Sequence, residues 1–215
     1  MRIFLHVVTI LLLGVVLGLT IREFRGRGLT ADAERVVFSN DGPLDPDSVT
    51  EDEPAMAPEG WMTEFELTER SGEPVSSEDL LGQPYVVSFF FSTCPSICVQ
   101  QNQKVQQLQS EFADSGVRFV SISVDPETDT PTALREYAAR FGADADQWLF
   151  LTGDLIYIRR IGAEIFKLAV DEKFHTEKFI LVDPSGQIVG YYSWPEAKQF
   201  EKLKVDIRNQ LERAA

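Results

Sequence analysis

Residues 86–98 have the sequence VVSFFFSTCPSIC, an apolar run that ends in the only two cysteines of the 215-residue chain. The run has the length and the aromatic and β-branched content of a buried strand. Thr93 and Pro95 then indicate the start of a helix. Cys94 and Cys98 are therefore expected at a strand-to-helix corner, one helical turn apart, where unpaired backbone N–H groups favour a thiolate. The stretch predicts reactive sulfur chemistry.

Strands and helices alternate after this stretch. The predicted elements are a helix over 100–112, a strand over 117–124, a helix over 132–141 opened by Thr130-Pro131, a strand over 148–151 and a helix over 154–166 capped by Asp154 or Thr152. The apolar face of the first helix is predicted to be core, and its six glutamines are expected on the surface. The alternation implies parallel strands in an α/β sheet covered by helices.

Two hairpins are predicted to flank this central unit. The first pairs 65–67 with 74–75 across a Ser-Gly turn, and the second pairs 178–182 with 187–192 across Asp-Pro-Ser-Gly. A helix over 195–211 closes the chain. The connecting segment 167–176 carries His175, and the only other histidine is His6.

The N-terminal part differs in character. Residues 3–21 are nearly all apolar and uncharged, and as a helix they would span about 28 Å, enough to cross a bilayer core. An uncleaved transmembrane anchor is favoured over a signal peptide because no small-x-small site closes the run. Residues 28–60 hold four prolines among many acidic residues, which is typical of an extended tether. We therefore divide the chain into an anchor with a basic flank (1–27), an acidic flexible linker (28–60) and a folded domain (61–215).

Charge and motifs narrow the function classes. The formal net charge is −14, and because the first 27 residues hold four arginines and one glutamate, the remainder is more acidic still. Such a surface excludes nucleic acid as a natural partner. The chain has no phosphate-cradling glycine loop and no His-Glu-x-x-His motif. Two cysteines can close one disulfide, which fits an oxidising compartment.

Three segments, taken together and in this order, resemble the SCO/SenC family of membrane-anchored copper proteins. They are FFFSTCPSIC (89–98), SISVDPETDTP (121–131) and FHTEKFILVDPSGQIVGYY (174–192). The resemblance extends over about 65–211. It implies a thioredoxin-like fold with a central mixed sheet flanked by helices.

The resemblance also implies a metal site. In that family the cysteines of a Cys-x-x-x-Cys motif and a distant histidine bind copper, which corresponds here to Cys94, Cys98 and His175. Two thiolates and an imidazole suit Cu(I), and sulfur-nitrogen sites can also hold Cu(II). On one helical turn the two Cα atoms would lie about 6 Å apart, so the sulfurs could chelate one ion or close a disulfide.

Some residues depart from the family pattern or leave alternatives open. Many members have a proline directly after the second cysteine, where this chain has Val99. Many also have an acidic residue between the two cysteines, which this chain lacks. Thioredoxin-type oxidoreductases usually carry a proline where this chain offers His175, which favours metal binding over dithiol exchange. Asp125 and Asp129 could orient ligands or steer copper, or they could simply end a strand and precede a helix.

The resemblance implies a copper chaperone rather than an enzyme, one that delivers copper to the dinuclear copper centre of cytochrome c oxidase. Its partners would be the copper-site subunit and other copper or thiol carriers. The alternative is a thiol-disulfide oxidoreductase with Cys94 as nucleophile and Cys98 as resolving thiol, and a weaker third reading is a peroxidase. The resemblance places the domain in the periplasm, held by a single pass through the cytoplasmic membrane, although the arginines after the apolar run favour the opposite orientation.

Overall fold

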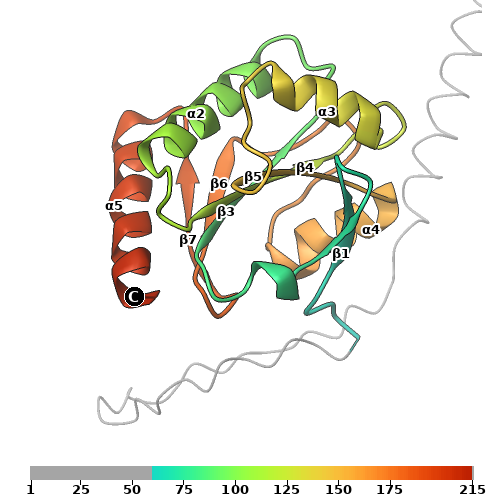
Figure 1. Ribbon diagram of the computed structural model, residues 1–215. Coiled ribbons are helices and arrows are strands. Elements are labelled where there is room, and N and C mark those ends of the chain that lie inside the picture. Colours follow the sequence, from blue (N-terminus) through green and yellow to red (C-terminus); the bar gives the residue numbers. More distant parts are fainter. Residues whose placement is uncertain (1–59, 215) are drawn as a thin grey trace, which may run out of the picture. The chain divides into compact units, whose positions relative to one another are not determined.

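A seven-stranded sheet forms the centre of the protein, with its strands in the order β2-β1-β5-β4-β3-β6-β7 (Figure 1). The computed structural model describes residues 60–214. The predicted anchor over 3–21 and nearly all of the predicted linker lie outside the described residues. Within 60–214, no helix has the length and apolar character needed to cross a membrane.

The strands are β1 (Glu66–Glu69), β2 (Pro74–Ser76), β3 (Tyr85–Phe90), β4 (Arg118–Ser123), β5 (Trp148–Thr152), β6 (Lys178–Val182) and β7 (Ile188–Ser193). The helices are α2 (Ile97–Glu111), α3 (Pro131–Ala139), α4 (Leu155–Arg160) and α5 (Ala197–Ala214), together with the 3₁₀ turn η1 (Glu78–Leu80) and the π-helical turn η2 (Ile161–Ile165).

The sheet is mixed. Strand β3 pairs in parallel with β4, and β4 pairs in parallel with β5. The pairs β3–β6, β6–β7, β1–β2 and β1–β5 are antiparallel. This arrangement confirms the predicted α/β fold, in which alternation specifies the parallel centre and two hairpins form the edges.

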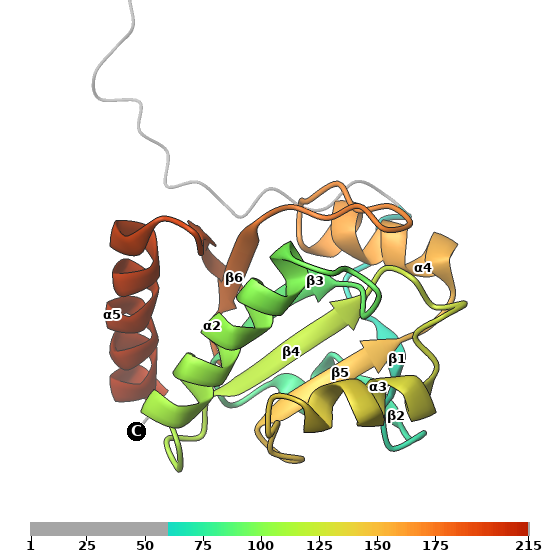
Figure 2. The ribbon, with the colours of Figure 1, turned by 90° about the horizontal axis from the view of Figure 1, so that it is seen from above.

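Helices cover both faces of the sheet (Figure 2). Helices α2, α3 and α5 pack on one face, over a core that includes Phe90 and Phe150. Helix α4 and η2 pack on the other, over a core that includes Val87 and Phe89. All six residues of β3 are buried, which explains why its sequence is a continuous apolar run rather than an alternating one.

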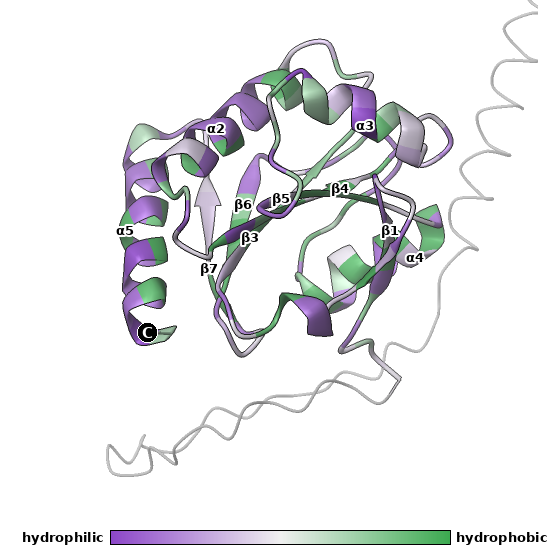
Figure 3. Cartoon of the chain, viewed as in Figure 1, coloured by the Kyte–Doolittle hydropathy of each residue, from purple (hydrophilic) through white to green (hydrophobic). Residues whose placement is uncertain are grey.

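Helix α5 shows the amphipathic pattern of a helix with one covered face. Phe200, Leu203 and Ile207 are buried along it, and the remaining surface is largely hydrophilic (Figure 3). The spacing of three and four residues places these side chains on one stripe of the helix. The stripe packs in the same core as α2.

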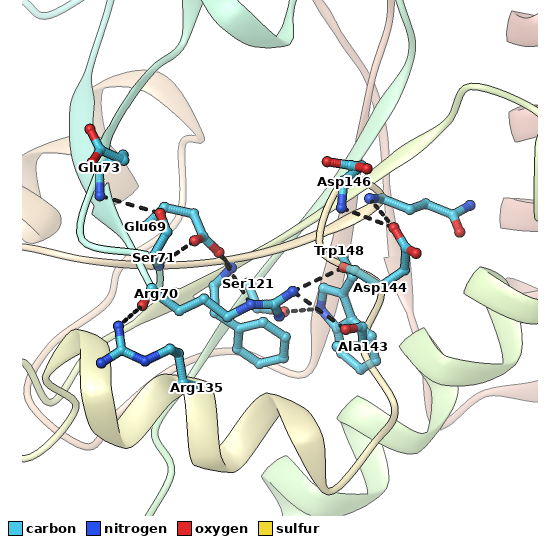
Figure 4. Close-up of polar contacts among 12 residues, drawn as sticks. Glu69, Arg70, Ser71, Glu73, Ser121, Arg135, Ala143, Asp144, Asp146 and Trp148 are labelled. Carbon is cyan, nitrogen blue, oxygen red and sulfur yellow. Dashed lines mark hydrogen bonds and ion pairs between the residues drawn. The ribbon is translucent and has the colours of Figure 1, made fainter.

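A buried arginine follows β1 and connects this strand to the loop before β5 (Figure 4). The guanidinium of Arg70 donates through Nη2 to the carbonyl oxygens of Ala143 and Asp144, at 3.4 and 3.0 Å. Arg135 in α3 donates to the Arg70 carbonyl at 2.8 Å. Glu69 accepts from the backbone N–H of Ser71 at 2.6 Å. These bonds hold β1 to the loop that precedes β5.

The structure corrects two predictions about the first long helix. The helix begins at Ile97 rather than near Thr93 or Pro95, because Ser96 has φ −138° and ψ −73°, outside the helical region. The second correction concerns Gln101, which is fully buried rather than on the surface. The predicted helix over 154–166 is present as α4 and η2, with Asp154 as its cap at 2.9 Å from the N–H of Tyr157.

The aromatic core offers a stability test. Phe150 is fully buried and contacts the rings of Phe90, Tyr137 and Trp148. Replacing it in Phe150→Ala should lower the free energy of unfolding by about 3–5 kcal/mol, because a large cavity remains. Urea denaturation measures this change. The exposed control Ile156→Ala should stay within about 0.5 kcal/mol of wild type, and equal losses in the two variants would contradict the assignment of the core.

Candidate metal centre

The two cysteines lie where β3 leads into α2. Cys94 belongs to the connecting segment 91–96, and Cys98 is the second residue of the helix. The N–H of Cys98 lies 3.5 Å from the Sγ atom of Cys94. Both are free thiols, with Cys94 6% and Cys98 0% exposed. The predicted corner is therefore present, although only one of the cysteines lies within the helix.

The two thiols have opposite electrostatic environments. Burial disfavours the Cys94 thiolate, but hydrogen bonds from the backbone of Cys98, Ser96 and Ile97 outweigh it, so the pKa of Cys94 falls below its ordinary value. Burial raises the pKa of Cys98 to about 12, with further contributions from the Cys94 side chain and the charge of Asp129. Cys94 is consequently the thiol that ionises first.

His175 approaches the same corner from the segment between η2 and β6. Its Nε2 atom lies 3.0 Å from the Sγ atom of Cys98, and its Nδ1 atom lies 3.1 Å from the carbonyl oxygen of Thr176. A carbonyl oxygen can only accept, so Nδ1 carries the proton and Nε2 presents its lone pair to the sulfur. Burial lowers the pKa of His175, which favours this neutral form. The ring of Phe91 packs edge-on against the imidazole.

The structure brings all three predicted ligands into one chain of contacts. Cys98 is the shared neighbour, because its backbone N–H contacts the Cys94 sulfur and its own sulfur contacts His175 Nε2. A histidine that donates one ring N–H to a backbone carbonyl and directs the other nitrogen at the site is a common metal-ligand arrangement. Among residues 60–214, no three His, Cys, Asp or Glu side chains already form a ready-made metal cage.

Asp125 and Asp129, for which the sequence leaves two roles open, are buried beside the cysteine segment. Asp129 is 0% and Asp125 2% exposed. Asp129 accepts from the N–H of Ser92 at 3.0 Å, and the Asp125 carboxylate lies 3.5 Å from the hydroxyl of Thr93. Asp125 follows the end of β4 and Asp129 precedes α3, as the simpler alternative expects, and Thr130 rather than either aspartate caps α3.

Gln101 is the site-supporting residue that the sequence prediction missed. Its Nε2 atom donates to the Phe89 carbonyl at 2.9 Å, and its Oε1 atom accepts from Trp194 Nε1 at 3.1 Å. These bonds attach the first turns of α2 to the end of β3. Its position three residues after Cys98 and four before Val105 places it on the buried stripe, a signal that was present in the sequence.

The sequence around this site matches a known protein family. Residues 54–212 match the family model described as SCO1/SenC. The chain belongs to the SCO1/SenC family. The match includes the three segments on which the resemblance was based.

Members of the SCO1/SenC family with known sequence or structure agree with this assignment. A SCO1 protein homolog of Bacillus subtilis is 30% identical over 154 residues, which are 67% of this chain and 80% of that protein. BsSco, described as a member of the Sco family of cytochrome c oxidase assembly proteins with a disulfide switch, gives a TM-score of 0.63 at 29% identity, covering 69% of this chain and 91% of that one. ScoI of Bradyrhizobium japonicum, solved with copper bound, gives 0.56 at 26% identity, covering 70% and 99%. The mixed sheet with flanking helices is thus the Sco fold.

The difference between the two thiols predicts selective alkylation. Cys94 should react with iodoacetamide first, and at pH values below the ordinary thiol pKa, because its pKa is lowered while that of Cys98 is raised to about 12. Peptide mass spectrometry after limited labelling of the reduced protein measures the order. Equal labelling of the two cysteines under native conditions would contradict the prediction, and equal labelling in urea is the control.

Proposed function

We propose that this protein is a copper chaperone that delivers copper to the dinuclear copper centre of cytochrome c oxidase during its assembly. The observation that carries the proposal is the 3.0 Å approach of His175 Nε2 to Cys98 Sγ, beside Cys94. Thiolate sulfur and imidazole nitrogen are the donors that soft Cu(I) prefers, and the same set can hold Cu(II). Family membership and the copper-bound relative support the same cargo.

The protonation states suit stepwise binding. Cys94 has the lowered pKa and supplies the first thiolate, while neutral His175 offers its Nε2 lone pair without losing a proton. Cys98 loses its proton only when the cation compensates for burial, because its pKa is raised to about 12. Copper uptake would therefore release protons and tighten as pH rises. Delivery would proceed by ligand exchange, with thiolates of the partner replacing those of Cys94 and Cys98 in turn.

The proposed setting is the periplasmic face of the cytoplasmic membrane. The apolar run over 3–21 would anchor the chain by a single pass, and the acidic segment over 28–60 would hold the domain away from the bilayer. The proposed partners are the copper-site subunit of the oxidase and other copper or thiol carriers. The acidic composition of the chain disfavours nucleic acid.

A second function is favoured by the thiol geometry. Cys94 is the more acidic thiol and lies against the N–H of Cys98, the arrangement of a nucleophile with a neighbouring resolving thiol. The disulfide switch named for BsSco points in the same direction. In this function the protein would keep the cysteines of a copper-site partner reduced. Both functions require the two cysteines, but only copper binding requires the histidine.

Copper titration of the reduced full-length chain tests the chaperone function. Wild type should bind one copper tightly, and His175→Ala should lose about tenfold or more in affinity, because even outer-shell partners of a metal ligand are worth that much. Cys94→Ala and Cys98→Ala should lose more, since each removes a thiolate. Competition with a chromophoric Cu(I) chelator and direct Cu(II) titration measure these losses.

The matched control is His6→Ala, which removes the only other histidine and should bind copper as wild type does. The chaperone proposal fails if wild type binds no copper tightly or if His175→Ala binds equally well. Full thiol-disulfide exchange activity in His175→Ala, together with loss of that activity in both cysteine variants, would favour the oxidoreductase.

The proposed location has its own test. Alkaline phosphatase fused after Ala215 should be active in a bacterial host, because this enzyme forms its disulfides only in an oxidising compartment. A β-galactosidase fusion at the same position is the control and should be inactive. The reverse pattern would place the domain in the cytoplasm and overturn the proposal.

A further inference from the structure

The segment that carries Cys94 has little regular structure of its own. Residues 91–96 lie between the end of β3 and the start of α2. Inside the segment, the N–H of Cys94 donates to the carbonyl of Phe91 at 3.3 Å. A segment with so few internal bonds samples many conformations unless neighbouring elements hold it. The position of Cys94 relative to Cys98 therefore depends on contacts from outside the segment.

Asp129 supplies the principal outside contact. Its carboxylate accepts hydrogen bonds from both the N–H and the hydroxyl of Ser92, two residues before Cys94. It also accepts from the hydroxyl of Ser123, at the end of β4, at 2.5 Å. The carboxylate is fully buried. It thus links the cysteine segment to the neighbouring strand, which is fixed in the sheet.

The same loop reaches the segment that carries His175. The N–H of Lys173, two residues before His175, donates to the Val124 carbonyl at 3.3 Å. The Nζ atom of Lys173 lies 3.6 Å from the buried carboxylate of Asp125. The loop after β4 therefore contacts two segments of the candidate site. It binds Ser92, two residues before Cys94, and Lys173, two residues before His175.

Asp129 has no other evident task that needs a carboxylate. Thr130 caps α3, with its Oγ1 atom accepting from the N–H of Ala133 at 3.3 Å. Burying a carboxylate is costly unless several donors compensate, and two of the donors to Asp129 come from Ser92.

We propose that Asp129 is a positioning residue that holds the Ser92–Cys94 chain against β4 and so keeps the Cys94 sulfur beside Cys98. The inference deepens the proposed function, on which its copper consequence rests. Its consequence for the thiol pair stands independently of copper. Without this anchor Cys94 has more conformations, and the effective concentration of its thiol at Cys98 falls.

The thiol-disulfide equilibrium of the full-length chain measures this effective concentration. In a glutathione buffer, one oxidised glutathione accepts two electrons and two protons from Cys94 and Cys98, giving one disulfide in the protein and two reduced glutathione molecules. The equilibrium constant should fall about tenfold or more in Asp129→Ala, because this variant removes both bonds to Ser92 and a single hydrogen bond to a charged group is worth that much. Asp129→Asn retains an acceptor for the Ser92 N–H, so it should recover most of the wild-type value.

The matched control is Glu69→Gln. Glu69 is also a buried carboxylate that accepts backbone N–H groups, those of Ser71 and Phe150, but it lies at the end of β1, which β5 and β4 separate from the cysteine-bearing end of β3 (Figure 4). Its variant should keep the wild-type equilibrium constant. A similar fall in Glu69→Gln would show that general loss of stability moves the thiol equilibrium, and would overturn the inference.

A milder variant keeps the test decisive if Asp129→Ala does not fold. Ser92→Ala removes only the hydroxyl bond and leaves the carboxylate and the Ser92 N–H in place, so the constant should fall about threefold, in proportion to a partial loss. A folded Asp129→Ala with the wild-type constant overturns the inference. If Asp129→Ala is unfolded, an unchanged constant in Ser92→Ala does so.

Cu(I) affinity, measured by chelator competition on the same variants, separates the two proposals. Asp129→Ala should bind Cu(I) about tenfold more weakly than wild type, with Glu69→Gln unchanged, because a displaced Cys94 is a poorer ligand. If wild type itself binds no copper, the proposed function fails while the thiol equilibrium still decides the role of Asp129. If wild type binds copper and Asp129→Ala matches it in both measurements, only the positioning role fails.

Discussion

The pairing of β3 with its two neighbours is the constraint on which the site depends. Strand β3 runs parallel to β4 and antiparallel to β6. The C-terminal ends of β3 and β4 and the N-terminal end of β6 therefore meet at one edge of the sheet. The cysteine segment follows β3, the aspartate loop follows β4 and His175 precedes β6. The order and direction of these strands bring together three segments that are far apart in the sequence.

Polar groups buried near this edge are held by specific bonds. Asp129 anchors Ser92, and Gln101 connects α2 to the Phe89 carbonyl and to Trp194. A buried polar group without a partner is costly, so these bonds strongly favour one arrangement of the chain around the thiols. The apolar clusters on the two faces of the sheet provide the rigid support. The site thus combines a rigid sheet and helix with a short irregular segment that carries Cys94, one of the three candidate ligands.

The asymmetry between the thiols follows from this construction. Cys94 lies in the irregular segment, where several N–H groups converge on its sulfur and lower its pKa. Cys98 lies inside the helix and the core, where burial raises its pKa to about 12. A pair with one thiol of lowered pKa and one of raised pKa suits both stepwise metal exchange and disulfide chemistry. The neutral imidazole of His175 next to Cys98 is the feature that favours copper.

Periodicity and spacing were sufficient for the α/β class and nearly all the strands and helices, because burial patterns are local properties, whereas the three candidate ligands were named from the resemblance to the SCO/SenC family. The start of α2 at Ile97 was not predictable in this way, because Ser96 lies outside the helical region of φ and ψ, in a segment that Asp129 holds through Ser92. Gln101 can be buried because its side-chain amide bonds to the carbonyl of Phe89 and the indole N–H of Trp194. Likewise, only the antiparallel placement of β6 brings His175 to Cys98. Contacts between residues far apart in the chain decided these features. Local sequence patterns cannot predict such contacts, because the two residues of each contact lie in different segments.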